Sequence, residues 1–158
     1  MIEIHGIEEK DKEWITNLLI NQWGSTNIVS RGKIHDASVL HGFIAMVDDK
    51  PVGLITYNIE GGECEIVTLN SLLDGKGIGT QLIEAVKNVA KDHNCKRIWI
   101  IETNDNTKAL RFYQKRGFHL IAVYPNALEQ SRKLKPEIPL VGTDNIPLRD
   151  EIELEILR

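Results

Sequence analysis

One amphipathic helix between two apolar segments constrains the fold of this chain most. Within residues 77–93, apolar side chains recur at helical spacing on one face: Ile78, Leu82, Ile83, Val86, Val89 and Ala90. Residues 63–69 before it read as a strand, and residues 97–102 after it are nearly all apolar, as expected of a strand buried on both faces within a sheet. We therefore predict a parallel strand–helix–strand unit.

The residues before this unit predict an antiparallel meander. Residues 43–47 and 52–59 read as two strands joined by a turn at residues 48–51. Gly61-Gly62 supplies the next turn, so that residues 63–69 become the third strand.

The ends of the chain complete an α+β fold. Before the meander we expect a short strand at residues 2–4, a helix at 11–22 and an irregular segment with one helical turn at 27–40. After the parallel unit we expect further elements, in this order: a helix at 106–116, a strand at 119–124, a short helix at 126–133, a long loop, and a strand at 151–157. Glutamates alternate with aliphatic residues in that last strand, which predicts one wet face.

Length and charge narrow the classes of function. With 158 residues we expect a single domain spanning 1–158. The net charge of −4 opposes binding to a phosphate backbone, so we expect no nucleic-acid partner. The apolar runs fall far short of the roughly 18 residues that cross a bilayer, and the start lacks the pattern of a secretory signal. We therefore expect no membrane partner and a cytoplasmic location.

The two cysteines predict neither a disulfide nor a metal site. Cys64 and Cys95 lie far apart in the sequence, without a CxxC pair or nearby histidine ligands. We expect both to be reduced and buried, and we expect no metal.

A glycine-rich turn begins the long helix. Gly75, Gly77 and Gly79 fall within five residues, where bare backbone N–H groups and the helix dipole favour an anion such as a phosphate. Glycines in such a turn also serve tight packing, which is the alternative explanation. The dinucleotide fingerprint and the Walker pattern are both absent, which argues against a nucleotide-binding module.

A second motif lies about thirty residues further along the chain. Residues 103–118 read TNDNTKALRFYQKRGF and resemble the second signature block of the GNAT (Gcn5-related) N-acetyltransferase family. The glycine turn resembles the first block, Gln/Arg-x-x-Gly-x-Gly/Ala, with Asp74 where the family usually has Gln or Arg. The order of elements is similar to the family's fold as well. The resemblance implies an N-acetyltransferase that uses acetyl-CoA as co-substrate.

The resemblance also implies which residues would bind acetyl-CoA. The pyrophosphate would rest on consecutive backbone N–H groups of the turn: Gly75, Lys76, Gly77, Ile78, Gly79 and Thr80. The backbone of Leu69, at the end of the preceding strand, would hold and polarise the thioester carbonyl. Asn106 would contact the cofactor from the opposite wall.

The resemblance implies that a primary amine attacks acetyl-CoA directly, and that two further residues take part in this reaction. Tyr113 would give its proton to the departing thiolate; the alternative is a core aromatic whose hydroxyl caps a backbone group. An amine with an ordinary pKa of about 10 must also lose a proton. Glu65 matches a position where some family members place a glutamate, and would be the base. Its alternative is a solvated strand face that carries Glu63 and Glu65.

The acceptor is not specified by these motifs. Residues 30–33 and 132–142 stand where the family shapes its acceptor pocket, and a solvated connector explains the second segment equally well. We expect a small-molecule or peptide amine as partner, with a homodimer as an open alternative. The competing function is a non-catalytic acyl-CoA-binding sensor or docking module, which would keep the glycine turn without needing Tyr113 or a base.

Overall fold

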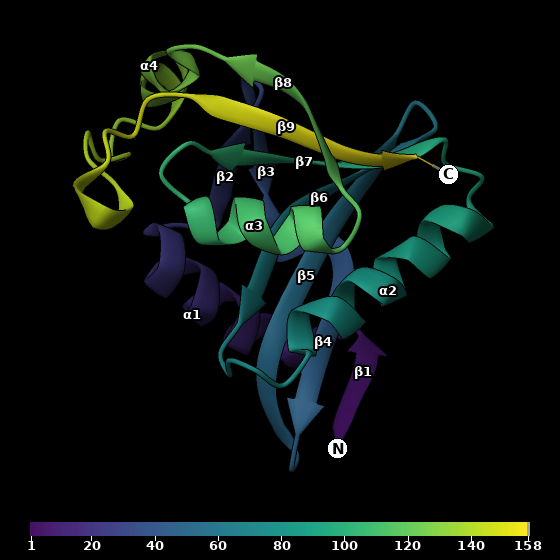
Figure 1. The fold of residues 1–158 in the computed structure, drawn as a ribbon. Helices are drawn as coiled ribbons and strands as arrows, with labels where there is room; N and C mark the ends of the chain where they lie inside the picture. Colours follow the sequence, from purple (N-terminus) through teal and green to yellow (C-terminus); the bar gives the residue numbers. More distant parts are fainter. Residues whose placement is uncertain (158) are drawn as a thin grey trace.

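A mixed sheet forms the centre of the fold in the computed structural model, which describes residues 1–157 (Figure 1). Seven strands lie in the order β1-β4-β5-β6-β7-β9-β8, and β2 and β3 form a separate hairpin. Within residues 1–157, β6 and β7 are the only neighbouring strands of the seven-stranded sheet that run parallel. The predicted α+β fold, with a meander followed by a parallel step, is confirmed.

The elements have the following bounds. The strands are β1 Ile2–Gly6, β2 Asn27–Ser30, β3 Lys33–Asp36, β4 His41–Val47, β5 Lys50–Glu60, β6 Glu63–Ser71, β7 Arg97–Thr103, β8 His119–Tyr124 and β9 Glu151–Leu157. The helices are α1 Lys12–Trp23, α2 Ile78–Asp92, α3 Thr107–Lys115 and α4 Ala127–Leu134, with short 3-10 turns at Glu9–Asp11, Ala37–Val39 and Thr143–Asn145. No helix in residues 1–157 is long and apolar enough to cross a membrane.

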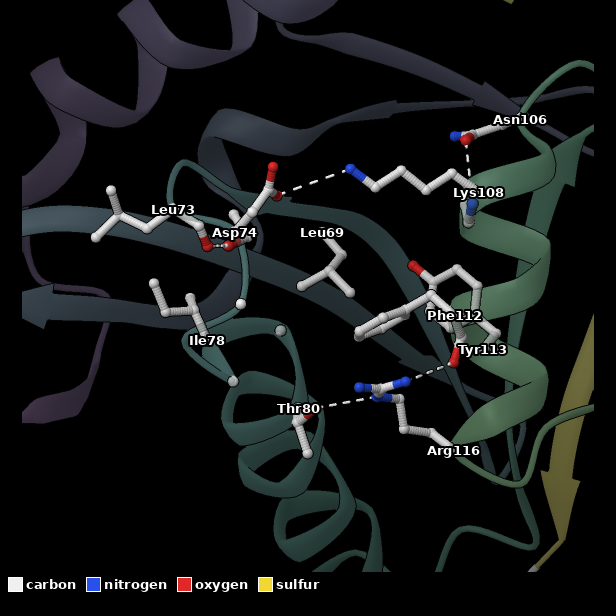
Figure 2. Close-up of a pocket in the computed structure, with 15 residues that line it drawn as sticks. Leu69, Leu73, Asp74, Ile78, Thr80, Asn106, Lys108, Phe112, Tyr113 and Arg116 are labelled. Carbon is white, nitrogen blue, oxygen red and sulfur yellow. Dashed lines mark hydrogen bonds and ion pairs between the residues drawn. The ribbon is translucent and has the colours of Figure 1, made fainter.

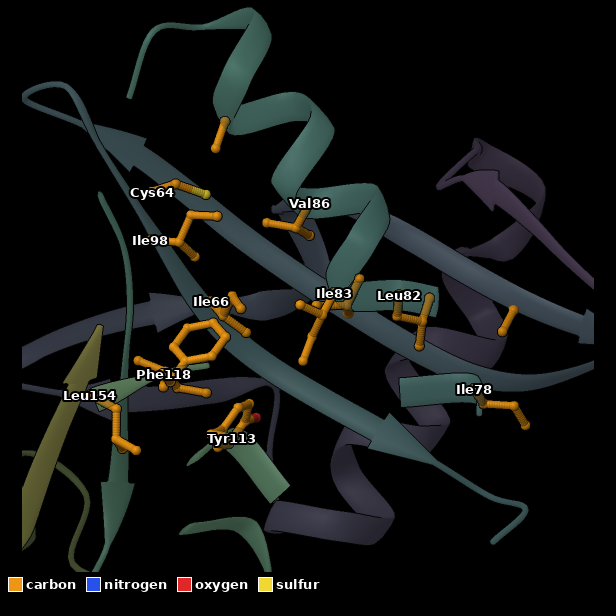
Figure 3. Close-up of a cluster of buried hydrophobic side chains, with 14 of the residues drawn as sticks. Cys64, Ile66, Ile78, Leu82, Ile83, Val86, Ile98, Tyr113, Phe118 and Leu154 are labelled. Carbon is orange, nitrogen blue, oxygen red and sulfur yellow. The ribbon is translucent and has the colours of Figure 1, made fainter. Parts of the chain in front are cut away.

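The apolar stripe of α2 packs on one face of the sheet (Figure 3). Ile78, Leu82 and Ile83 are buried there, together with Cys64 and Ile66 of β6. Both Cys64 and Cys95 are buried, as predicted. The opposite face of the meander packs against α1 through its own apolar cluster.

A bulge in β6 separates β6 from β7. Thr68 pairs with Thr56 and Ile66 pairs with Tyr57, so Val67 is an extra residue in β6. The parallel pairing of β6 with β7 ends at Ile66 and Ile100. Because β7 continues along β9 for three more residues, to Thr103, the two parallel strands diverge at this point.

The irregular segment predicted at residues 27–40 is wrong in its first part. Residues 27–36 form the hairpin β2–β3, and only Ala37–Val39 form the expected helical turn. Arg31 and Gly32 form the two-residue turn with φ of +48° and +75°, the conformation that such tight hairpins need. The sequence did not indicate this hairpin because its first turn position holds an arginine, not the usual Asn, Asp or Gly.

The predicted wet face of the last strand is also wrong. Glu151 and Glu153 are 2% and 6% exposed, because β9 lies inside the sheet between β7 and β8. The Arg97 guanidinium donates to Glu153 over 2.7 Å, and the Tyr124 hydroxyl donates to the same carboxylate over 2.7 Å.

The prediction that residues 97–102 are buried on both faces holds for one face only. Ile98 and Ile100 are buried towards α2, whereas Trp99 and Ile101 on the other face are only partly buried. The strand is central in the sheet, but its second face carries the polar layer formed by Arg97 and its partners Glu63, Glu153 and Glu155.

Gly53→Ala is expected to destabilise the fold by about 1–3 kcal/mol, because α2 packs directly on Gly53. A Cβ at this position would lie 2.6 Å from Cγ2 of Ile78 and 3.1 Å from Cδ1 of Leu82. Gly6→Ala is the matched control, since a Cβ there meets nothing within 4 Å. Thermal denaturation of both variants checks the expectation, and equal melting temperatures would contradict it.

Candidate active site

A cavity of about 530 Å³ lies between the start of α2 and α3 (Figure 2). It brings together most of the residues predicted for the cofactor: Leu69, Gly75, Gly77, Ile78, Gly79, Thr80 and Asn106. Tyr113 lines the same cavity. Lys76 belongs to the turn, and its side chain is exposed rather than part of the described lining.

The glycine turn leaves backbone donors free at the start of α2. Gly75 and Gly77 have φ of +72° and +76°, and a Cβ on either would meet nothing within 4 Å. The first intrahelical bond runs from the Gln81 N–H to the Gly77 carbonyl over 3.1 Å. The N–H groups of residues 78–80 therefore have no acceptor within the helix, an arrangement that together with the helix dipole favours an anion.

Gly79 has the packing role that was the alternative for these glycines. A Cβ at Gly79 would lie 2.9 Å from Cζ of Phe112 on α3. Arg116 joins the same two helices: its Nε donates to Oγ1 of Thr80 over 3.0 Å, and its guanidinium lies 3.9 Å from the centre of the Phe112 ring. Sequence reasoning missed Arg116, because a cation just before Gly117 looks like an ordinary charge at a helix C-terminus.

Asp74, which departs from the family pattern, lies at the mouth of the cavity. Its carboxylate is 3.7 Å from Nζ of Lys108, and both side chains are more than 80% exposed (Figure 2). An ion pair this exposed contributes little to stability. Asp74 therefore places a negative charge beside the glycine turn, and its ion pair with Lys108 does little to hold the turn in place.

A second cavity, of about 520 Å³, adjoins the first. Leu69, Asn106, Ala109 and Tyr113 line both cavities, so the two meet at these side chains. The second cavity also contacts the end of β7, residues 28–29 and the segment around residues 135–148. We call it the acceptor-side cavity.

Arg132 holds the segment that follows α4 in place, although most side chains of this segment are exposed. Arg132 donates to the carbonyls of Ile138, Pro139 and Leu148 over 3.2, 2.7 and 2.5 Å. Ile138, Pro139 and Leu148 also line the acceptor-side cavity. One arginine thus shapes the wall of that cavity through three backbone contacts.

Tyr113 stands where the two cavities meet. Its side chain is 3% exposed and packs edge-on against Phe112 and Phe118. In Figure 2 it points across the first cavity towards Leu69. Burial, with a smaller contribution from the charge of Glu102, raises the pKa of Tyr113 well above its usual range. The phenol is therefore protonated at neutral pH and can act as a donor.

Glu65 is not part of a solvated face. It is 5% exposed, accepts a hydrogen bond from Oγ of Ser30 over 2.7 Å, and lies 3.3 Å from Nε2 of His35. It lines a separate hollow of about 200 Å³ with Arg31 and Trp99. Its role as base stays a prediction.

Glu102 was not predicted as a site residue. It lies on β7 two residues beyond the last pair with β6, and it lines the acceptor-side cavity. Oε1 accepts a hydrogen bond from Nδ2 of Asn106 over 3.1 Å. Burial raises the pKa of Glu102 to about 7. The sequence feature that could have indicated Glu102 as a site residue is its position as a carboxylate at the end of an otherwise apolar strand.

The split sheet, with a glycine turn and unpaired helix N–H groups at the start of α2 beside the split, defines a GNAT-type fold. The model of the acetyltransferase (GNAT) family matches residues 7–118, and the protein belongs to this family. No group of three or more His, Cys, Asp or Glu side chains within residues 1–157 is arranged to hold a metal ion.

Similar proteins agree with this assignment. Uncharacterized protein YdhI of Bacillus subtilis (strain 168) is 44% identical over 142 residues, which cover 89% of each chain. The structure of an IAA acetyltransferase from Bacillus cereus ATCC 14579 matches with a TM-score of 0.76 at 20% identity, over 100% of both chains. A GNAT family acetyltransferase from Elizabethkingia anophelis with acetyl-CoA bound matches with a TM-score of 0.70 at 20% identity, over 99% of this chain and 98% of that one. These structures confirm the fold.

Glu102→Gln is expected to stabilise the protein at pH 8. The pKa of about 7 lies above the ordinary value of 4.5, so the folded state holds this proton more tightly than the unfolded state. Stability from this group is therefore present below pH 4.5 and is lost as the pH rises through 7. Because glutamine stays neutral, the variant should gain about 2–3 kcal/mol over the parent at pH 8 and little at pH 4.

Melting curves at pH 4 and pH 8 check this expectation. Glu137→Gln is the control, because the exposed Glu137 lines the same cavity without being buried. The same offset at both pH values would mean that the effect does not come from titration of Glu102.

Proposed function

We propose that this protein is an N-acetyltransferase that moves an acetyl group from acetyl-CoA to a primary amine, supplied by a small molecule or a peptide, by direct attack. The observation that carries the proposal is the meeting of two cavities at Leu69 and Tyr113. One cavity ends at an anion-binding helix start, and the other has carboxylates in its wall. A non-catalytic acyl-CoA sensor would need only the first.

The residues of the first cavity fit acetyl-CoA. The N–H groups of residues 78–80 and the open space beside Gly75 and Gly77 suit a pyrophosphate. Leu69 lies in the part of β6 that has no partner strand on the β7 side, so its backbone is available to a carbonyl. When bound, acetyl-CoA supplies the acetyl group as an activated thioester.

Tyr113 is the proton donor in this proposal. A thiolate such as that of cysteine has a reference pKa of about 8.5, so its departure at neutral pH is helped by a donor at the sulfur. The Tyr113 hydroxyl remains protonated over the working range because burial raises its pKa. Its position at the junction of the cavities lets it reach a group held at Leu69.

Gly77→Leu is expected to abolish the thermal stabilisation of the protein by acetyl-CoA. The new side chain would point into the open space that the cofactor needs, whereas the parent should gain stability as RT ln(1 + [L]/Kd). Gly62→Leu is the matched control, since Gly62 has φ of +75° and equally open surroundings in the turn between β5 and β6. Equal ligand-induced shifts in all three proteins would rule out the phosphate site.

Tyr113→Phe is expected to lower kcat by roughly 10²-fold or more, with near-parental stability and acetyl-CoA affinity. The ring and its packing remain, and only the donor is lost. The measurement is CoA release with a panel of polyamines, aminoglycosides and peptide N-termini. Tyr57→Phe, which removes a hydroxyl on β5 away from the described lining of both cavities, is the control. An unchanged kcat in Tyr113→Phe would make Tyr113 a packing residue.

A further inference from the structure

We infer that Glu102 contacts the acceptor ammonium group and takes its proton. This inference rests on the acetyl transfer proposed above. It assigns the base to β7, on the opposite side of the split sheet from Leu69.

The first observation is the place of Glu102 in the split. It alternates with Ile98 and Ile100 on β7, and so shares the face of the strand that packs towards α2 and α3. Beyond the pair Ile66–Ile100, β6 no longer covers this edge of β7. Glu102, Leu69 and Tyr113 all line the acceptor-side cavity.

The second observation is the orientation of the carboxylate. The Asn106 amide donates from Nδ2 to Oε1 of Glu102 over 3.1 Å, while its Oδ1 accepts from the Ala109 N–H over 3.2 Å. Asn106 is the N-cap of α3, so this helix start fixes the amide and the amide positions Glu102. Both ends of the Asn106 amide thus form hydrogen bonds within the protein, and its contact with the cofactor stays a prediction.

The third observation is the lack of a countercharge. Among residues 1–157 Glu102 forms no ion pair, and Lys135, the cation in the lining of the acceptor-side cavity, donates to the carbonyls of Trp23 and Asn27 over 3.2 and 2.7 Å. An ammonium group would supply the missing charge. A desolvated carboxylate attracts such a group strongly, because the surrounding dielectric is low.

The other carboxylates near the acceptor-side cavity are already engaged or exposed. Asp105 accepts from the Thr103 hydroxyl over 2.5 Å and from the Thr143 N–H over 2.9 Å. Glu151 accepts from the backbone N–H and the guanidinium of Arg31, both over 3.4 Å. Glu137 is exposed at the rim.

Glu65 is engaged as well. Ser30 donates to one of its oxygens, and His35 lies beside the other. Its hollow is lined by residues different from those of the two larger cavities. The geometry therefore favours Glu102 over Glu65 as the base.

The titratable groups that line the acceptor-side cavity with Glu102 come from several elements. They are Asp105 and Tyr113 before and within α3, Glu151 on β9, and Lys135 and Glu137 after α4. Burial raises the pKa of Glu102 to about 7, with a small further rise from Asp105. A carboxyl group of this pKa is half ionised at neutral pH and is a stronger base than an ordinary glutamate.

The proton balance is simple. The Glu102 carboxylate takes one proton from R–NH3+, which leaves R–NH2 and a neutral carboxyl group. The amine nitrogen then forms the N–C bond as the C–S bond breaks, and sulfur keeps the electron pair and takes the Tyr113 proton. The new amide returns its extra proton to the Tyr113 phenolate, and Glu102 releases its own to water.

Kinetics of Glu102→Gln test the inference. In the parent, kcat/KM for an amine should fall below about pH 7 as Glu102 becomes protonated, in addition to any loss from protonation of the amine itself. The variant should lose 10²-fold or more at pH 7, with the loss shrinking at high pH where the amine is already neutral. Acetyl-CoA should stabilise the variant as much as the parent. Glu3→Gln, at an exposed glutamate on β1 outside the lining of the described cavities, should behave as the parent.

A readout without acetyl transfer separates this inference from the proposed function. With 13C-labelled glutamate, the resonance that is absent from Glu102→Gln should titrate near pH 7 in the parent. Adding n-butylamine should move that midpoint to lower pH, because the ammonium charge stabilises the carboxylate, and n-butanol should not.

Two results would overturn the inference. One is a Glu102 titration that n-butylamine leaves in place; the other is an active Glu102→Gln variant with a parental pH profile, particularly if Glu65→Gln is inactive. A parent that binds acetyl-CoA but acetylates no amine would instead refute the proposed function and with it the base role, while an amine-dependent titration would still support the contact at Glu102.

Discussion

The divergence of β6 and β7 after the pair Ile66–Ile100 determines where every part of the site lies. Parallel neighbours in a sheet normally satisfy each other's backbone groups, and the extra residue at Val67 ends that pairing. The end of β6 then presents Leu69, and the end of β7 presents Glu102, to the space between them. A packed sheet is thereby opened at its centre without loss of the apolar layer under α2.

Close helix packing surrounds that opening. α2 lies directly on Gly53 of β5, and α3 packs against α2 through Gly79 and Phe112. Arg116 adds a hydrogen bond and a cation–π contact between the two helices. The free N–H groups at the start of α2 and the phenol of Tyr113 are therefore carried by two helices that contact each other directly.

Local patterns in the sequence predicted the elements, whereas contacts between distant segments decided what the charged residues do. The α2 stripe and the meander follow from periodicity and turn residues within short windows. The place of β9 between β7 and β8 depends on a pairing across some fifty residues, and this pairing turns Glu153 from a predicted surface residue into the partner of Arg97. The same holds for Glu65, whose partners Ser30 and His35 come from the unpredicted hairpin. The geometry of the glycine turn could be predicted because it depends on local backbone conformation alone.

Within residues 1–157, Glu102 lacks the arginine partner that the buried carboxylates of β9 have. Glu153 accepts hydrogen bonds from Arg97 and Tyr124, and Glu151 accepts one from Arg31, although burial still raises the pKa of Glu151. Glu102 has hydrogen bonds but no cation, and its raised pKa means that ionisation at neutral pH opposes folding. A group that weakens the fold when ionised is typical of a functional site, where an arriving partner supplies the missing charge. An ammonium group in the acceptor-side cavity would be such a partner, because it would both stabilise the carboxylate and bring its own proton to the base.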